Sequence, residues 1–204
     1  MLKKNWSSKG LFIASLATLT LLVAGAANAV AMFDLTSKKN WYGKSWSTEV
    51  HGIELKLTAH STDGREWVHM GKWGTGVYSY KGDSTQIDGW GPDERLRMHF
   101  SEMVHIVKVE FTEANGSGDD WSLDIDGKTI VDDKASGSGI WWANKAVFDK
   151  PGTIMDFYAD HKNDDFKIKK IWVKKWEKPV PEPSAALVFG IGLLVASQAS
   201  RRRR

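Results

Sequence analysis

The stretch Glu94-Arg95-Leu96-Arg97-Met98-His99-Phe100 decides the fold class, because its side chains alternate strictly. Leu96, Met98 and Phe100 occupy every second position, and charged or polar residues stand between them. Successive side chains of a β-strand point to opposite faces of a sheet, so the alternation predicts a strand with one face in a core and the other in solvent.

The same two-residue period recurs through the middle of the chain. The further segments that show it are residues 51–59, 66–70, 76–80, 104–112, 121–125, 128–131, 140–148, 153–159 and 165–176. Turns rich in Gly, Asp and Asn separate them, and no segment keeps a helical period of 3.6 residues. We therefore predict an all-β domain, an antiparallel β-sandwich or jelly-roll-like fold, over residues 30–178.

Three local patterns refine this prediction. Asp126-Gly127 is typical of a two-residue hairpin turn. In residues 165–176 the apolar positions change parity, which predicts a β-bulge at Lys169-Lys170. Residues 118–123 and 163–168 both place two aspartates directly before an aromatic residue that opens a strand. We expect these two loops to face each other at one end of the sandwich.

The N-terminal segment, residues 1–29, has the layout of a signal peptide. Lysines precede the apolar residues 11–24, and Ala27-Asn28-Ala29 provides the two small residues, Ala27 and Ala29, that a signal peptidase requires. The apolar run is shorter than the ~20 residues of a spanning helix, so we predict cleavage and export by the secretory route.

The C-terminal segment, residues 179–204, has three parts in a fixed order. Pro181, Glu182 and Pro183 precede an apolar stretch, residues 184–200, that is expected to form a transmembrane helix. The chain then ends in the basic cluster Arg201, Arg202, Arg203 and Arg204. By the positive-inside rule the arginines stay in the cytoplasm, so the domain is expected outside the inner membrane.

This C-terminal order resembles the PEP-CTERM sorting signal of Gram-negative bacteria. The resemblance implies that an exosortase recognises Pro181-Glu182-Pro183 and removes the helix and the arginines. It also implies a membrane-anchored intermediate and then a cell-surface or extracellular protein. Members of this family are associated with exopolysaccharide and with biofilm matrix, which makes exopolysaccharide an expected partner.

Charge and cysteine content exclude several function classes. Seven of the 28 lysines and arginines lie in residues 1–29 or 201–204, whereas all 25 acidic residues lie between these segments. The middle of the chain is therefore mildly acidic, and we predict no nucleic-acid partner. The chain has no cysteine, which excludes disulfides, zinc–thiolate sites and cysteine nucleophiles.

Aspartates at turns and strand starts form a candidate calcium site. The residues are Asp88, Asp93, Asp119, Asp120, Asp124 and Asp126. Calcium prefers several carboxylate and carbonyl oxygens that converge from loops. The alternative is that these aspartates only cap backbone N–H groups in turns.

Ten of the eleven tryptophans lie between Trp41 and Trp176, more than packing of one domain requires. Trp90, Trp141 and Trp142 are candidate glycan contacts, since an exposed indole offers a flat apolar face to a sugar ring. Trp141 and Trp142 are adjacent, so in a strand they face opposite ways and one core face cannot bury both. The alternative is that one faces the core and the other packs under a loop.

No catalytic residue is predicted. The six histidines are scattered without metal-ligand spacing, and no nucleophile elbow or phosphate-binding loop is present in the sequence. The leading hypothesis is a non-enzymatic surface or matrix protein. The alternative is a secreted carbohydrate-active hydrolase that uses paired acids. The lysine-rich stretch 167–178 predicts a solvated strand face or a contact with anionic polysaccharide.

Overall fold

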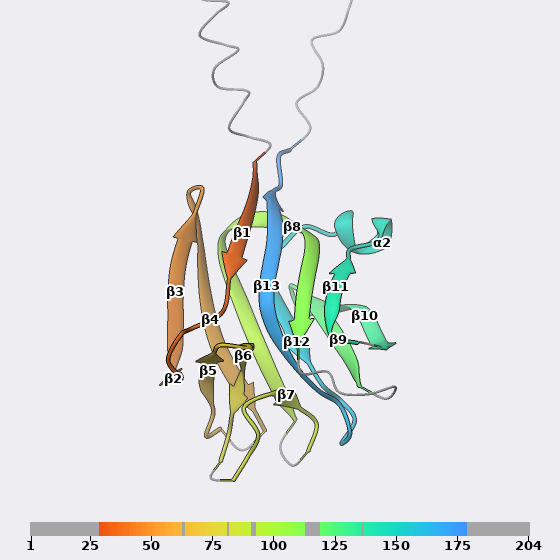
Figure 1. The fold of residues 1–204 in the computed structure, drawn as a ribbon. Helices are drawn as coiled ribbons and strands as arrows, with labels where there is room; N and C mark the ends of the chain where they lie inside the picture. Colours follow the sequence, from red (N-terminus) through yellow and green to blue (C-terminus); the bar gives the residue numbers. More distant parts are fainter. Residues whose placement is uncertain are drawn as a thin grey trace, which may run out of the picture.

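The computed structural model describes residues 29–178 apart from residues 63, 81, 91–92, 113–118 and 136. The predictions for Ala27, for Pro181-Glu182-Pro183, for the apolar residues 184–200 and for the terminal arginines lie outside these residues. In the described part, thirteen strands form antiparallel pairs and one four-residue helix is present (Figure 1). The predicted all-β, sandwich-like architecture is confirmed. No helix among the described residues is long and apolar enough to cross a bilayer.

The strands in chain order are β1 (Val30–Asp34), β2 (Trp41–Gly43), β3 (Ser45–Val50), β4 (Ile53–Ser61), β5 (Trp67–Gly71), β6 (Gly74–Tyr78), β7 (Ile87–Asp88), β8 (Glu94–Thr112), β9 (Asp120–Ile125), β10 (Lys128–Ala135), β11 (Gly139–Trp142), β12 (Gly152–Tyr158) and β13 (Asp165–Lys175). The helix α2 (Lys145–Phe148) lies between β11 and β12.

Strand β8 belongs to both layers of the fold. Its first half pairs with β4 and β12, and its second half pairs with β11 and β13. Figure 1 shows β8 curving over the top of the molecule between the two halves. The sequence predicted two strands, 94–100 and 104–112, whereas the structure has one of 19 residues, because Ser101, Glu102 and Met103 continue the extended backbone through the bend.

The two layers differ in their edges. The first runs β3-β4-β8-β12-β9-β10, and the second contains β11-β8-β13. On the far side of β13, β1 pairs with residues 170–174. The strand β6 pairs with β13 at Ile168, and β5 and then β2 follow β6 outward. Val30 of β1 lies opposite Lys174 of β13, so the first and last described strands leave the sandwich at the same pole (Figure 1).

The core lies between the layers, and an aromatic cluster joins them. Phe111 of β8 is 4.9 Å from Trp121, 6.2 Å from Phe157 and 5.7 Å from Phe166, measured between ring centroids. These partners belong to β9, β12 and β13, and all four rings are buried. Such edge-on and tilted contacts are the favoured arrangement of aromatic rings.

The three local predictions are confirmed. Asp126 and Gly127 have φ values of 48° and 77° and connect β9 to β10, as a type I′ hairpin turn requires. The register between β13 and β8 shifts between Ile168 and Lys170, which makes Lys169 the extra residue of a bulge. The two aspartate-bearing loops meet, because the N–H of Asp120 donates to Oδ1 of Asp164 at 3.1 Å.

Other predictions were wrong or incomplete. The predicted strand 140–148 ends at Trp142, because the Asn144 side chain accepts from the N–H of Val147 and caps a short helix, α2. The sequence reading also missed β1, β2 and β3. These strands are short, and β3 has few apolar residues to mark an inward face.

Substituting Phe111→Ala is expected to lower the free energy of unfolding by about 3–5 kcal/mol, because it opens a cavity where the two layers meet. Urea unfolding measures this loss. Trp142→Ala is the matched control, and it is expected to cost under about 1 kcal/mol since this side chain is 62 % exposed. Equal losses in the two variants would contradict the position of the core.

Candidate functional site

The outer face of the second layer carries a row of four side chains from four adjacent strands. Register places Lys108 of β8 opposite Trp142 of β11 on one side and opposite Trp172 of β13 on the other. Met32 of β1 lies opposite Trp172 and extends the row. We call these four residues the tryptophan–lysine row. Residues that alternate with the row along the strands, such as Val109 and Ile171, are buried in the core. The side chains of the row therefore point outward.

Lys108 holds the row together through cation–π contacts. Its Nζ is 4.1 Å from the ring centroid of Trp172 and 4.6 Å from that of Trp142. A cation over an indole face is attracted by the ring quadrupole, which favours this arrangement even at a surface. Trp142 is nevertheless 62 % exposed and Met32 40 % exposed, so the row offers apolar area to a ligand.

The surroundings of the row carry charges of both signs. The next row along the strands aligns Ile140, Glu110 and Lys170, and Glu110 forms ion pairs with Lys169 at 2.9 Å and Lys170 at 3.8 Å. Lys174 follows on the other side of Trp172. Trp142 and Trp172 stand two strands apart, which corresponds to about 10 Å at the ~4.8 Å spacing of a sheet.

The other two candidate tryptophans lie elsewhere. Trp141 turns inward and packs edge-on against Trp121 with 4.8 Å between ring centroids, and it also lines a hollow of about 370 Å³ together with Ile140. This confirms that Trp141 and Trp142 face opposite ways. Trp90 is 63 % exposed, but it follows β7 at the lower pole of Figure 1. There it lines a pocket of about 310 Å³ together with Tyr80, Asp83 and Asp88.

A buried carboxyl group adjoins this pocket. Glu94 is 1 % exposed, and its Oε2 accepts from the N–H of Asp88 at 3.3 Å, whereas Oε1 has no hydrogen-bond partner among the described residues. Burial, together with the nearby charges of Asp83 and Asp88, raises the pKa of Glu94 to about 9. Glu94 is, with Asp93, one of the paired acids of the hydrolase alternative. Its burial was not predicted, although it shares the parity of Leu96 and Met98 and is therefore on the inward face.

The six predicted calcium ligands do not form one site. Asp126 accepts from the N–H groups of Thr153 and Ile154, as expected for a turn aspartate. Asp88 accepts from Ser84 and from the N–H of Trp90, and burial raises its pKa. In the described part of the chain, none of the six belongs to a group of three or more acids or histidines whose ligand atoms lie within 4.8 Å of one another.

A different acidic group does converge. Asp133, Asp160 and Asp164 surround Nδ1 of His161 at 3.3, 3.2 and 3.8 Å. Hydrogen bonding to Asp160 raises the pKa of His161, and the other two carboxylates add to the effect. Asp164 also accepts from the N–H groups of Asp120 and His161, so it fixes the meeting point of two loops.

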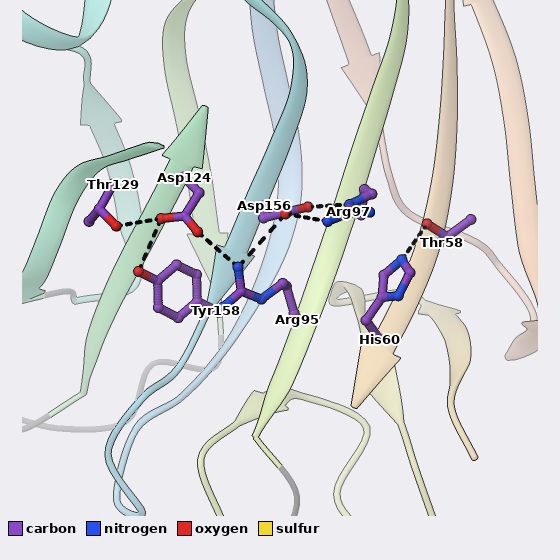
Figure 2. Close-up of polar contacts among 8 residues, drawn as sticks. All are labelled: Thr58, His60, Arg95, Arg97, Asp124, Thr129, Asp156 and Tyr158. Atoms are coloured by element: carbon purple, nitrogen blue, oxygen red, sulfur yellow. Dashed lines mark hydrogen bonds and ion pairs between the residues drawn. The ribbon is translucent and has the colours of Figure 1, made fainter. Parts of the chain in front are cut away.

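The outer face of the first layer is closed by ion pairs (Figure 2). Asp156 is 2 % exposed and accepts two hydrogen bonds of 2.8 Å from Arg97. Asp124 accepts from Arg95 at 2.9 Å, from Thr129 and from Tyr158. The hydrogen bond to Asp156 is the main cause that raises the pKa of Arg97. The bidentate bond from Arg97 to Asp156 and the single bond from Arg95 to Asp124 keep both carboxylates engaged with cations.

In comparisons with known proteins, no family model matches the chain, and no curated protein shows significant similarity to it.

The Glu94 carboxyl group is expected to make stability fall as pH rises. The folded protein retains this proton up to pH about 9, whereas the unfolded chain releases it above its ordinary pKa of 4.5. The contribution of this group to the free energy of unfolding is therefore full below pH 4.5, and it decreases as the pH rises from 4.5 to about 9. Glu94→Gln is expected to flatten the melting temperature against pH over this window, measured in the presence of chelator. Identical slopes in the two proteins would contradict the burial of an acid here.

Asp156→Asn is expected to lower the free energy of unfolding by about 1–2 kcal/mol, because Arg97 loses a bidentate partner but is partly solvated. Chemical denaturation measures the change. His60→Ala removes the exposed contact with Thr58 in Figure 2 and is expected to change stability by less than about 0.5 kcal/mol. A larger loss in His60→Ala than in Asp156→Asn would overturn the assignment of this network as structural.

Proposed function

We propose that this protein is an exported, non-enzymatic surface or matrix protein that binds an anionic polysaccharide. The observation that carries the proposal is the tryptophan–lysine row, in which Lys108 lies between two indoles and Trp142 is largely exposed. Indole faces stack on the apolar faces of sugar rings, and an ammonium group between them attracts carboxylate or sulfate substituents.

The extent of the row across four strands favours a chain ligand over a small molecule. Trp142 and Trp172 lie about 10 Å apart across the sheet, so a polymer that crosses the strands reaches both indoles. Lys174 flanks Trp172 along β13 and adds positive charge beside that path.

Export is the second part of the proposal. The signal peptide and the resemblance to the PEP-CTERM signal make signal peptidase and an exosortase the processing partners, with the inner membrane holding the intermediate. All described strands fit between the two proposed sorting segments, since β1 begins at Val30 and β13 ends at Lys175. Cleavage after Ala29 would therefore spare every strand of the sandwich.

One pair of carboxylates supports a non-enzymatic role. A hydrolase that acts on glycosides needs one carboxyl group that holds a proton and a second that attacks or activates water. Asp124 and Asp156 stand side by side in β9 and β12, and arginines bind both of them. At these two residues the arrangement favours structural ion pairs over acid–base catalysis.

Trp142→Ala is expected to weaken binding to alginate, a polyuronate, by about tenfold, because one stacking surface is lost. Lys108→Gln is expected to weaken binding similarly and to reduce its dependence on salt. A pull-down or quartz-crystal microbalance assay with immobilised alginate measures both. Trp90→Ala is the matched control and should bind as wild type.

Neutral dextran provides the specificity control. Equal binding to dextran and alginate would contradict the role of Lys108. Unchanged alginate binding in Trp142→Ala, or loss of binding in Trp90→Ala, would reject the tryptophan–lysine row as the binding surface.

A further inference from the structure

A second hollow opens on the outer face of the second layer, where β2, β5 and β6 adjoin β13. It has a volume of about 270 Å³. Lys38, Lys72 and Lys167 line it together with Tyr42 and Trp73. We call this hollow the basic pocket. It is separate from the tryptophan–lysine row but shares strand β13 with it, through Lys167 and Trp172.

The basic pocket presents two exposed cations. Three of its lining residues are lysines, and no aspartate or glutamate lines it among the described residues. Lys167 is only 6 % exposed, which corrects the expectation that the lysine-rich stretch is solvated throughout. Lys38 and Lys72 are exposed, so their charges at one hollow attract anions.

The aromatic side of the basic pocket is fixed by backbone packing. Gly74 has φ +134° and lies so close to β13 that a Cβ atom would stand 2.9 Å from the carbonyl oxygen of Ile168. The turn that carries Trp73 therefore rests against β13, and the Thr112 hydroxyl donates to the Trp73 carbonyl oxygen. The Trp73 ring, 54 % exposed, also lies 4.7 Å from Nζ of Lys72.

The wall that carries Lys38 is held by hydrogen bonds to backbone carbonyl oxygens. The N–H of Ser37 donates to the carbonyl oxygen of Gly71 at 3.0 Å, and the Thr75 hydroxyl donates to the carbonyl oxygen of Leu35 at 2.7 Å. These contacts tie the segment before Lys38 to β5 and β6. The lysines thus project from a backbone that is already ordered, which lowers the entropic cost of binding.

We propose that the basic pocket binds an anionic sugar unit, with its carboxylate or sulfate group beside Lys38 and Lys72 and its ring against Trp73 or Tyr42. The inference rests on the proposed function and gives it a second subsite. Lys167 and Trp172 are five residues apart on β13, which corresponds to about 17 Å at ~3.3 Å per residue. One extended polysaccharide chain can therefore occupy the basic pocket and the tryptophan–lysine row together.

The test uses trigalacturonate, an oligomer too short to span both places, and measures its affinity for the folded domain by isothermal titration calorimetry. The double variant Lys38→Gln/Lys72→Gln is expected to weaken binding at least about tenfold, because it removes two charged contacts. Lys56→Gln/Lys128→Gln changes the net charge equally on other surfaces and should bind as wild type. A sulfated disaccharide in place of the uronate distinguishes the two anionic groups.

Three results would overturn this inference: no heat of binding at millimolar oligomer, equal affinity in the pocket variant and the charge-matched control, or equal affinity for uncharged galactotriose. Because Lys38 and Lys72 lie on the surface side of the pocket, circular dichroism is expected to show both double variants folded. Trp73→Ala, which keeps all three lysines, gives an independent measure of the aromatic wall.

The outcome is separable from that of the main proposal. Lys108→Gln should leave trigalacturonate binding unchanged if the basic pocket holds the oligomer. Loss of trigalacturonate binding in Lys38→Gln/Lys72→Gln with full alginate binding in Trp142→Ala would support the pocket and reject the row. The reverse pattern would support the row and reject the pocket.

Discussion

The continuity of β8 through both layers is the constraint on which the rest of the structure depends. This strand pairs with β4 and β12 before its bend and with β11 and β13 after it, so one strand sets the register of four others. Phe111 then fixes the separation of the layers through its contacts with Trp121, Phe157 and Phe166. A shift of β8 by one residue would turn Lys108 inward and Val109 outward, and the tryptophan–lysine row would disappear.

The two outer faces differ in how their charges are neutralised, because β8 places different side chains on each face. Before the bend it offers Arg95 and Arg97, and aspartates of β9 and β12 neutralise them. After the bend it offers Lys108, whose neighbours across both strands are tryptophans and not acids. Charge on the first face is satisfied within the protein, whereas the second face keeps both exposed aromatic area and positive charge. This asymmetry is the physical reason to place ligand binding on the second layer.

Local patterns predicted the strands and turns well, since alternation and Asp126-Gly127 depend only on neighbouring residues. The outward side of Trp142 was predictable for the same reason. Its partners were not, because Trp172 lies far along the chain and meets Lys108 only through strand pairing. The burial of Glu94 could have been found from its parity with Leu96, but an acid at a strand start is usually read as a turn residue. The structure does not bring the six aspartates of the calcium prediction together, because several of them serve turns or ion pairs locally.

The account as a whole depends on ligand contact at the tryptophan–lysine row. The indole N–H signals of the folded domain in a ¹⁵N-correlated NMR spectrum test this contact directly, once alanine variants have assigned them. On titration with alginate oligosaccharide, the account predicts shifts of the Trp142 and Trp172 signals, while the signal of Trp121 in the core stays in place. Shifts confined to Trp90, or an unchanged spectrum at saturating oligosaccharide, would contradict it.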